Sequence, residues 1–294
     1  MTSPATPWPA TTTTRQSWRA RLRARLATAA SAAAAAAMTG AFLLTGCEAL
    51  PGAGSGALSA AQVSAIVASP DRTAADREND KRRKPEQMLA FVDPRPGMVA
   101  LDLVSGGGYT TELLARAIGP TGEVTGQAQP RDPNRPVPAG ARAPGAGVLE
   151  REARLAKSKT PAAPISLAMK RLVDPVPPTL QGKLDLVTLM FNYHDLGYLG
   201  EGRAQMNRAI FAALKPGGAY VIADHAGRPG TGISESTTLH RIEESFLRSE
   251  VEAAGFKLVE TGNFLRNPAD PRDRETPEPP MAKDEFVLKF VKPR

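Results

Sequence analysis

Cysteine is nearly absent from this chain of 294 residues, because Cys47 is the only one. A disulfide bond within the chain is therefore impossible, and a reactive or metal-binding thiol elsewhere in the sequence is excluded. Histidine is also scarce, with only His194, His225 and His240. The spacings of the three histidines match no compact ligand motif, so the sequence predicts no metal site.

Acidic residues are missing from the first 46 residues, which contain five arginines. The formal net charge of +7 is therefore concentrated in this stretch, and the remaining chain has 32 basic residues against 30 acidic ones. A balance this close to neutral does not indicate nucleic acid or an anionic membrane face as a partner.

The same stretch has the layout of an export signal. Its arginines precede an alanine-rich apolar run over 26–44, which ends in Leu-Thr-Gly followed by Cys47. This order is typical of a signal peptide, and its ending resembles a bacterial lipobox, in which the cysteine is lipidated. We expect a lipoprotein signal peptide over 1–46, lipidation at Cys47 and a flexible tether over 47–58. The protein is then expected in the periplasm or cell envelope, attached to the membrane through its lipid only. The alternative is an uncleaved transmembrane helix over 26–44.

Residues 59–97 are expected to be helical. Ser59 and Gln62 are spaced as a capping box, which predicts a short helix through Val67. A charged segment over 71–84 suits a solvated helical face. Pro85 is well placed as the first residue of another helix, which we expect to run to Phe91.

Residues 98–294 alternate strand-like and helix-like patterns, which predicts an α/β domain with a mostly parallel sheet and helices on both faces. The last two strand-like runs have no convincing helix between them, which favours an antiparallel final pair. Strands are expected at 98–104, 122–127, 164–169, 184–191, 218–223, 256–261 and 284–291. Helices are expected at 109–118, 148–157, 201–214 and 237–254, with loops at 128–147 and 266–283.

A glycine turn after the first of these strands is the most informative motif. It contains Gly106, Gly107 and Gly108 and leads directly into a helical pattern. Glycines there let a ligand lie against bare backbone amides at a helix start, although an ordinary strand-to-helix turn has the same pattern. A nicotinamide site would require a further glycine where Thr111 stands, which disfavours a nicotinamide-dependent enzyme.

The segment from Asp102 to Gly108 resembles motif I of the class I S-adenosylmethionine-dependent methyltransferases, with Val104 in place of the first glycine. The run over 214–224 resembles the segment that leads into the fifth strand of that superfamily, and 183–191 resembles its fourth strand. Together with Leu239-His-Arg-Ile242 and Leu265-Arg-Asn-Pro-Ala-Asp270, these motifs resemble a group of exported bacterial predicted methyltransferases over about 71–292. The resemblance implies a Rossmann-like seven-stranded sheet with an antiparallel last strand.

The resemblance also implies a binding site for S-adenosylmethionine. Asp174 would accept from the adenine amino group, unless it is only a mobile surface residue. Ala128 stands where a ribose-binding carboxylate is usual, so Gln127 or Gln129 would substitute with weaker hydrogen bonds. The methionine moiety would be held by Asp102, Ser105, Gly106, Gly107 and Gly108.

The segment over 59–97 would be a lid over this cofactor, with Arg77, Asp80 and Arg83 as candidate contacts. Asn192 and Tyr193 would border the cofactor and the acceptor pocket, although Tyr193 suits the core equally.

His194, next to Asp195, is the candidate general base. The implied function is methyl transfer to an unidentified small-molecule or envelope acceptor. The alternative is a catalytically degenerate methyltransferase-fold lipoprotein that binds a ligand or a partner, which the departures at Val104 and Ala128 suggest.

Overall fold

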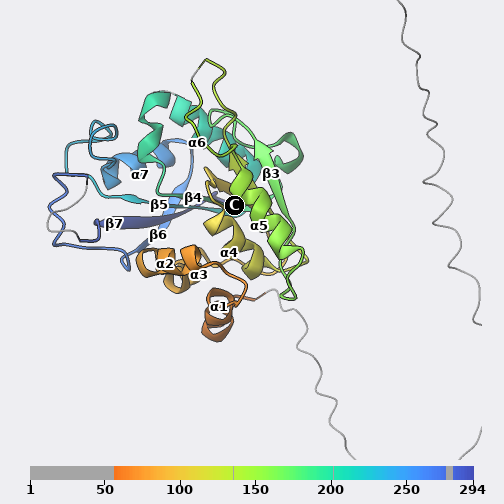
Figure 1. The fold of residues 1–294 in the computed structure, drawn as a ribbon. Coiled ribbons are helices and arrows are strands. Elements are labelled where there is room, and N and C mark those ends of the chain that lie inside the picture. The colour runs from red at the N-terminus through yellow and green to blue at the C-terminus, as the bar shows by residue number, and fades with distance from the viewer. Residues whose placement is uncertain (1–55, 135, 201, 276–280) are drawn as a thin grey trace, which may run out of the picture. The chain divides into compact units, whose positions relative to one another are not determined.

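The computed structural model describes residues 56–294 except 135, 201 and 276–280 (Figure 1). The expected signal peptide, Cys47 and most of the expected tether lie outside the described residues. None of the described helices has the length and apolar character needed to span a bilayer.

Seven strands form one sheet in the order β3-β2-β1-β4-β5-β7-β6, parallel except for β7, which pairs antiparallel with β5 and β6. This arrangement confirms the fold class predicted from the sequence. The strand order reverses between β1 and β4, and open α/β sheets bind ligands at the carboxyl ends of strands next to such a reversal. The strands are β1 (Val99–Leu103), β2 (Glu123–Ala128), β3 (Ile165–Met169), β4 (Leu184–Met190), β5 (Leu214–His225), β6 (Lys257–Gly262) and β7 (Glu285–Val291).

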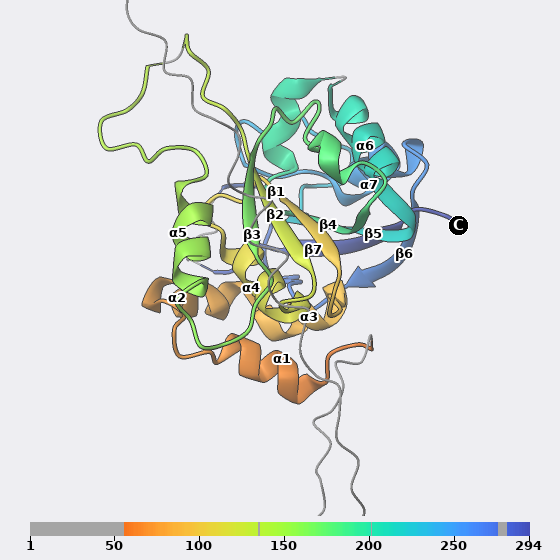
Figure 2. The same ribbon diagram turned by 90° about the vertical axis from the view of Figure 1, so that its right-hand side faces the viewer.

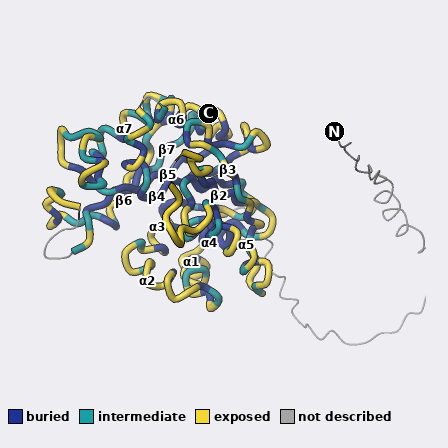
Figure 3. The backbone as a smooth tube through the Cα atoms, turned by 45° about the horizontal axis from the view of Figure 1, so that its top comes forward, coloured by how far each residue is buried: buried dark blue, intermediate teal, exposed yellow. Residues whose placement is uncertain are grey.

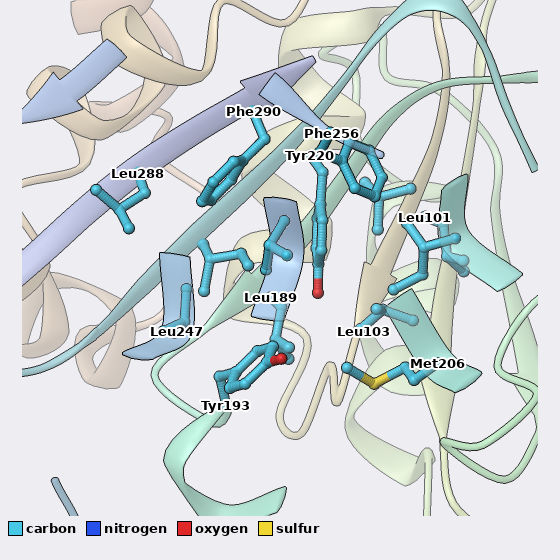
Figure 4. Close-up of a cluster of buried hydrophobic side chains, with 14 of the residues drawn as sticks. Leu101, Leu103, Leu189, Tyr193, Met206, Tyr220, Leu247, Phe256, Leu288 and Phe290 are labelled. Atoms are coloured by element: carbon cyan, nitrogen blue, oxygen red, sulfur yellow. The ribbon is translucent and has the colours of Figure 1, made fainter. Parts of the chain in front are cut away.

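Helices cover both faces of the sheet, so the central strands are buried between two apolar layers (Figure 3). On one face the core includes side chains of α3 (Pro85–Val92), α4 (Tyr109–Ile118) and α5 (Ala146–Leu155). On the other face it includes side chains of α6 (Gly202–Ala213), α7 (Glu244–Ala253) and the 3-10 turns η1 (Pro178–Leu180) and η2 (His194–Leu199). Figure 4 shows aromatic side chains of this second core, among them Tyr220, Phe256 and Phe290.

Two further helices precede α3, namely α1 (Ala60–Val67) and α2 (Ala74–Arg83). The capping box predicted for α1 is present, because the backbone amides of Ser59 and Gln62 each donate to the other's side chain. Pro85 is the first residue of α3, as expected. Val63 of α1 packs against Leu89 of α3, which attaches the N-terminal helices to the main domain.

The helix expected over 237–254 is wrong in its first part, because α7 begins only at Glu244. His240 has a φ of 50°, a left-handed conformation that ends any right-handed helix. The next residue, Arg241, is fully buried and donates to both carboxylate oxygens of Asp270. A contact between segments this far apart in the chain leaves no trace in local periodicity.

Candidate functional site

Two residues that directly follow strands have an unusual backbone conformation. Val104 follows β1 with a φ of 49°, and Phe191 follows β4 with a φ of 61°. Left-handed backbone is rare for β-branched and bulky residues and costs of order 1–3 kcal/mol, which proteins tolerate mainly at functional sites. The switch point between β1 and β4 is therefore the candidate site.

The glycine turn between β1 and α4 offers free backbone amides at this point. Gly106 and Gly107 are exposed, and no described residue accepts a hydrogen bond from either amide. A Cβ on Gly107 would meet no atom within 4 Å, whereas a Cβ on Gly108 would lie 2.7 Å from Arg151 Cδ. The turn is thus open on one side and packed on the other, as a ligand cradle at a helix start requires.

Asp102 does not lie in this cradle, contrary to the sequence prediction. Its two carboxylate oxygens accept hydrogen bonds from Thr111 Oγ1 at 2.6 Å and Thr188 Oγ1 at 2.7 Å. Burial raises the pKa of Asp102 to about 6, although these two bonds act in the opposite direction. The carboxylate ties β1 to α4 and β4, so a direct ligand contact does not fit this geometry.

Gln127 is also turned inward, which corrects the ribose contact expected for it. Its side-chain oxygen accepts from the Val104 amide at 2.9 Å, and its nitrogen donates to the Lys170 carbonyl at 2.6 Å. The Ser105 hydroxyl donates to the Gln127 carbonyl at 2.9 Å. Ser105 and Gln127 therefore hold the turn in shape and do not present polar groups to a ligand.

Gln129, the other residue expected at the end of β2, is partly exposed. Its side chain donates to the Tyr198 hydroxyl at 2.9 Å. Gln129, Arg171 and Tyr198 line an open cavity of about 1110 Å³ together with the loop after β2. A cavity of this size accommodates a nucleoside-sized ligand.

Asp174 and Asn192 lie at the surface near the ends of strands. Asp174 is exposed and pairs with Lys170 at 2.6 Å. The Asn192 side chain is partly exposed and donates to the Met190 carbonyl at 2.7 Å. Tyr193 is buried in the core, which agrees with the core alternative (Figure 4). Its hydroxyl donates to Glu250 of α7 at 3.0 Å.

Helix α2 reaches several elements along the carboxyl edge of the sheet, and Figure 2 shows it beside α4 and α5. Each of four α2 side chains contacts a different element. Asp76 pairs with Arg151 of α5 at 2.6 Å, and Asp80 accepts from the Tyr109 hydroxyl of α4 at 2.6 Å. Arg82 pairs with Glu285 of β7 at 2.9 Å, and Arg83 stacks on Phe191 after β4. The helix therefore lies close to the open glycine turn.

Arg83 differs from its neighbours on α2 because it makes no hydrogen bond or ion pair with any residue that the structure describes. Its guanidinium is largely buried over the Phe191 ring. Burial, together with repulsion from Arg82, lowers the pKa of Arg83 to about 10, so it stays charged at neutral pH. An unpaired cation at this edge is suited to an anionic ligand group.

His194 is buried between two carboxylates. Its Nδ1 lies 2.5 Å from Asp224 Oδ1, its Nε2 lies 3.1 Å from Asp195 Oδ1, and its backbone amide donates to Asp224 Oδ2. Burial disfavours the charged ring, but the hydrogen bonds to Asp195 and Asp224 outweigh it and raise the pKa of His194 to about 9. Because both ring nitrogens are occupied, the general-base role predicted for His194 does not fit this arrangement.

The two other histidines lie beside it. The His225 ring centroid is 5.3 Å from that of His194, and the His240 centroid is 5.6 Å away. His240 Nδ1 lies 3.2 Å from Asp195 Oδ1, and His225 Nδ1 lies 3.0 Å from a Glu285 oxygen. Sequence spacing gives no sign of this cluster, since the loop that contains His240 folds back onto the end of β4.

A scan against protein-family models and a search of curated proteins each find no match. Solved structures do match the fold. An arsenic(III) S-adenosylmethionine methyltransferase from Chlamydomonas reinhardtii has a TM-score of 0.50 at 15% identity, over 79% of this chain and 73% of that one. The cyclase SpnF has a TM-score of 0.50 at 17% identity, over 75% of this chain and 81% of SpnF. A complex of the Haloferax volcanii Trm112 methyltransferase activator with its partner has a TM-score of 0.50 at 18% identity, over 75% of this chain and 94% of the matched chain.

The fold is the Rossmann-like methyltransferase fold. Of the three neighbours, the Chlamydomonas protein is an S-adenosylmethionine methyltransferase and SpnF is a cyclase. Identities of this size relate the folds alone, so activity has to be argued from the residues at the carboxyl edge.

Proposed function

We propose that this protein is an S-adenosylmethionine-dependent methyltransferase that binds its cofactor at the carboxyl ends of β1 and β4, next to α2. The observation that carries the proposal is the open glycine turn, whose free amides at Gly106 and Gly107 lie at the start of α4. Arg83 supplies an unpaired positive charge at the same edge of the sheet. Free amides and a cation together suit the carboxylate of an amino-acid-bearing nucleoside.

The remaining polar groups fit the other parts of S-adenosylmethionine. Gln129 borders the open cavity after β2 and would bind the ribose hydroxyls, as a neutral acceptor weaker than a carboxylate. Asp174, after β3, would accept from the adenine amino group. The cofactor, when bound, supplies a methyl group activated by a sulfonium. The protein's main contribution is to position the methyl acceptor against it.

Asp195 is the polar side chain proposed to orient that acceptor. Its side chain is 45% exposed, so it can accept a hydrogen bond from a hydroxyl or amine. His194 holds Asp195 in place through its Nε2. The acceptor is proposed to be a small molecule or a component of the cell envelope, which follows from the expected export signal and lipidation of Cys47.

A catalytically silent ligand-binding protein is the second candidate. It is favoured by the full pairing of His194 and by Ala128 at the end of β2, since neither provides the reactive or cofactor-binding group expected there. The second candidate binds a ligand or a partner, which need not be S-adenosylmethionine. Only the first requires methyl transfer.

Calorimetry of the full chain in detergent tests the proposal, with S-adenosylhomocysteine, S-adenosylmethionine and NAD as ligands. We expect one site for the first two ligands and none for NAD. Labelled S-adenosylmethionine incubated with an envelope extract should then transfer label to an acceptor. Binding without any transfer would support the silent protein, and absence of S-adenosylmethionine binding would overturn the methyltransferase.

A further inference from the structure

Two histidines and an aspartate converge after the ends of β4 and β5. Asp195 Oδ1 lies 3.1 Å from His194 Nε2 and 3.2 Å from His240 Nδ1. The ligating atoms of the three side chains all lie within 4.8 Å of one another. They come from η2 and from the loop that precedes α7, so the fold and not the local sequence assembles them.

We propose that His194 Nε2, a carboxylate oxygen of Asp195 and His240 Nδ1 bind one divalent transition-metal ion. Imidazole nitrogens with one carboxylate suit ions such as Zn²⁺ or Fe²⁺, whereas Ca²⁺ and Mg²⁺ prefer oxygen ligands alone. Metal–ligand bonds of roughly 2.0–2.2 Å place adjacent ligands about 3 Å apart. The spacing of the Asp195 oxygen from the two histidine nitrogens is close to that value.

A buried carboxylate behind His194 supports the assignment independently. Asp224 is fully buried and lies 2.5 Å from His194 Nδ1. The backbone amides of His194 and His225 both donate to it, so its position is fixed. Metal-binding histidines typically donate their second ring N–H to such a carboxylate, which orients the other nitrogen toward the ion. Asp224 would leave Nε2 as the ligating nitrogen, and the ion would displace to solvent the proton that Nε2 directs at Asp195 in the ion-free chain.

The third ligand, His240, is held by a strained backbone conformation. His240 has a φ of 50°, and the adjacent Arg241 is anchored by Asp270 and by the Ala226 carbonyl. This anchor keeps the loop against the end of β5 and presents the His240 ring to Asp195. Strained backbone that the surroundings enforce is typical of binding sites.

The cluster is open on one side. The side chains of Asp195 and His240 are 45% and 44% exposed, whereas that of His194 is 4% exposed. Three protein ligands with an open side leave a coordination position for water or for an oxygen of a substrate, the arrangement found in catalytic metal sites. This inference goes beyond the proposed methyl transfer, since ion binding requires no S-adenosylmethionine.

Titration of the full chain with Co²⁺, purified without a histidine tag, tests the site. We expect one Co²⁺ per chain with visible d–d absorption, which one equivalent of Zn²⁺ displaces. Asp195→Asn and His240→Ala should each abolish the absorption. Asp185→Asn is the matched control, because Asp185 lies at the opposite end of β4 and pairs with Lys215. All variants keep Cys47, so any ion bound by that thiol contributes equally to each.

A further variant separates the ligands from the residue that orients them. Asp224→Asn keeps all three ligands and should weaken Co²⁺ binding by about 10- to 100-fold. Circular dichroism of each variant checks that it is folded. Should the parent show no saturable binding, or should the folded Asp195→Asn and His240→Ala variants bind Co²⁺ as the parent does, the metal site is wrong.

Discussion

The guanidinium carbon of Arg83 lies 4.0 Å from the centroid of the Phe191 ring, which joins the end of α2 to the end of β4. Phe191 adopts a left-handed backbone at this point, with a φ of 61°. The contact holds a cation at the switch point without neutralising it, because a ring face attracts positive charge but supplies no counter-ion. Arg83 therefore remains available to a carboxylate.

Replacing Arg83 with methionine should weaken binding of S-adenosylhomocysteine by about 10- to 100-fold. A hydrogen bond to a charged group contributes about 1.5–3 kcal/mol, and about 1.4 kcal/mol corresponds to a tenfold change in affinity. Calorimetry measures the effect. 5′-Methylthioadenosine, which lacks the amino-acid portion, should bind the parent and the Arg83→Met variant equally.

Arg77→Met is the control for that experiment. Arg77 lies on the same helix, is exposed, and donates to the Ser69 carbonyl away from the glycine turn. The Arg77→Met variant should bind S-adenosylhomocysteine and 5′-methylthioadenosine as the parent does. Equal losses for the two ligands in the Arg83→Met variant would mean that Arg83 shapes α2 and does not contact the carboxylate.

Gly107→Ala should fold normally and lose at least tenfold in affinity for S-adenosylhomocysteine. A Cβ at this position meets no protein atom within 4 Å, so the free energy of unfolding should change by less than about 0.5 kcal/mol. The added methyl group takes space that the ligand needs. Gly56→Ala, an equally open position that precedes α1, should leave affinity unchanged. Undiminished affinity in Gly107→Ala would move the ligand away from the turn.

Asp102→Asn should stabilise the protein near neutral pH without abolishing ligand binding. Because the pKa of Asp102 rises from 3.8 when unfolded to about 6 when folded, the folded state binds this proton more tightly. Its contribution to stability is therefore complete below pH 3.8 and is lost as the pH rises to about 6. A shift of about 2 units corresponds to about 3 kcal/mol.

Urea unfolding of the parent and of Asp102→Asn between pH 4 and 8 measures this loss. The stability of the variant relative to the parent should grow by about 3 kcal/mol between pH 4 and 7, since an amide does not ionise. A difference that does not vary with pH would show that Asp102 is not the titrating group. Loss of S-adenosylhomocysteine binding in the folded variant would restore Asp102 to the ligand site.

Cys47→Ser should release the protein from membranes in a Gram-negative host. The basic leader, the apolar run and the Leu-Thr-Gly ending precede this cysteine in the order of a lipoprotein signal. Fractionation and the size of the processed chain measure the effect. A variant that is processed and partitions like the parent would contradict lipidation at Cys47.

The centre of the sheet was largely predictable because β1 and β4 are mostly apolar runs that follow a glycine within a few residues. The failure at 237–254 has a specific cause, since the burial of Arg241 against Asp270 overrides the local helical pattern. Val104 shows a related limit. Its side chain departs from the glycine pattern, yet its backbone adopts a glycine-like φ of 49°, held by the Gln127 side chain. Val104 therefore has the left-handed backbone expected of a glycine at this position, although it is not a glycine.

The location of the candidate site could be predicted from the sequence, but the roles of its residues could not. Asp102, Gln127 and His194 all lie at the expected strand ends, yet each is turned toward partners inside the fold. Sequence locates a residue along a strand, whereas burial and pairing depend on segments far away in the chain. Asp224 and Glu285 were missed because a carboxylate next to a strand end has no distinctive spacing.

The attachment of α2 to the rest of the domain should depend on ionic strength. Asp76 is buried, and the contacts of this helix with α4, α5 and β7 are hydrogen bonds and ion pairs of Asp80, Asp76 and Arg82 rather than apolar packing. Salt screens the more exposed pair of Arg82 with Glu285 far more than the buried pair of Asp76 with Arg151. Rising ionic strength should therefore loosen the end of α2 at Arg82 before its start at Asp76, so access to the glycine turn depends on salt separately from stability.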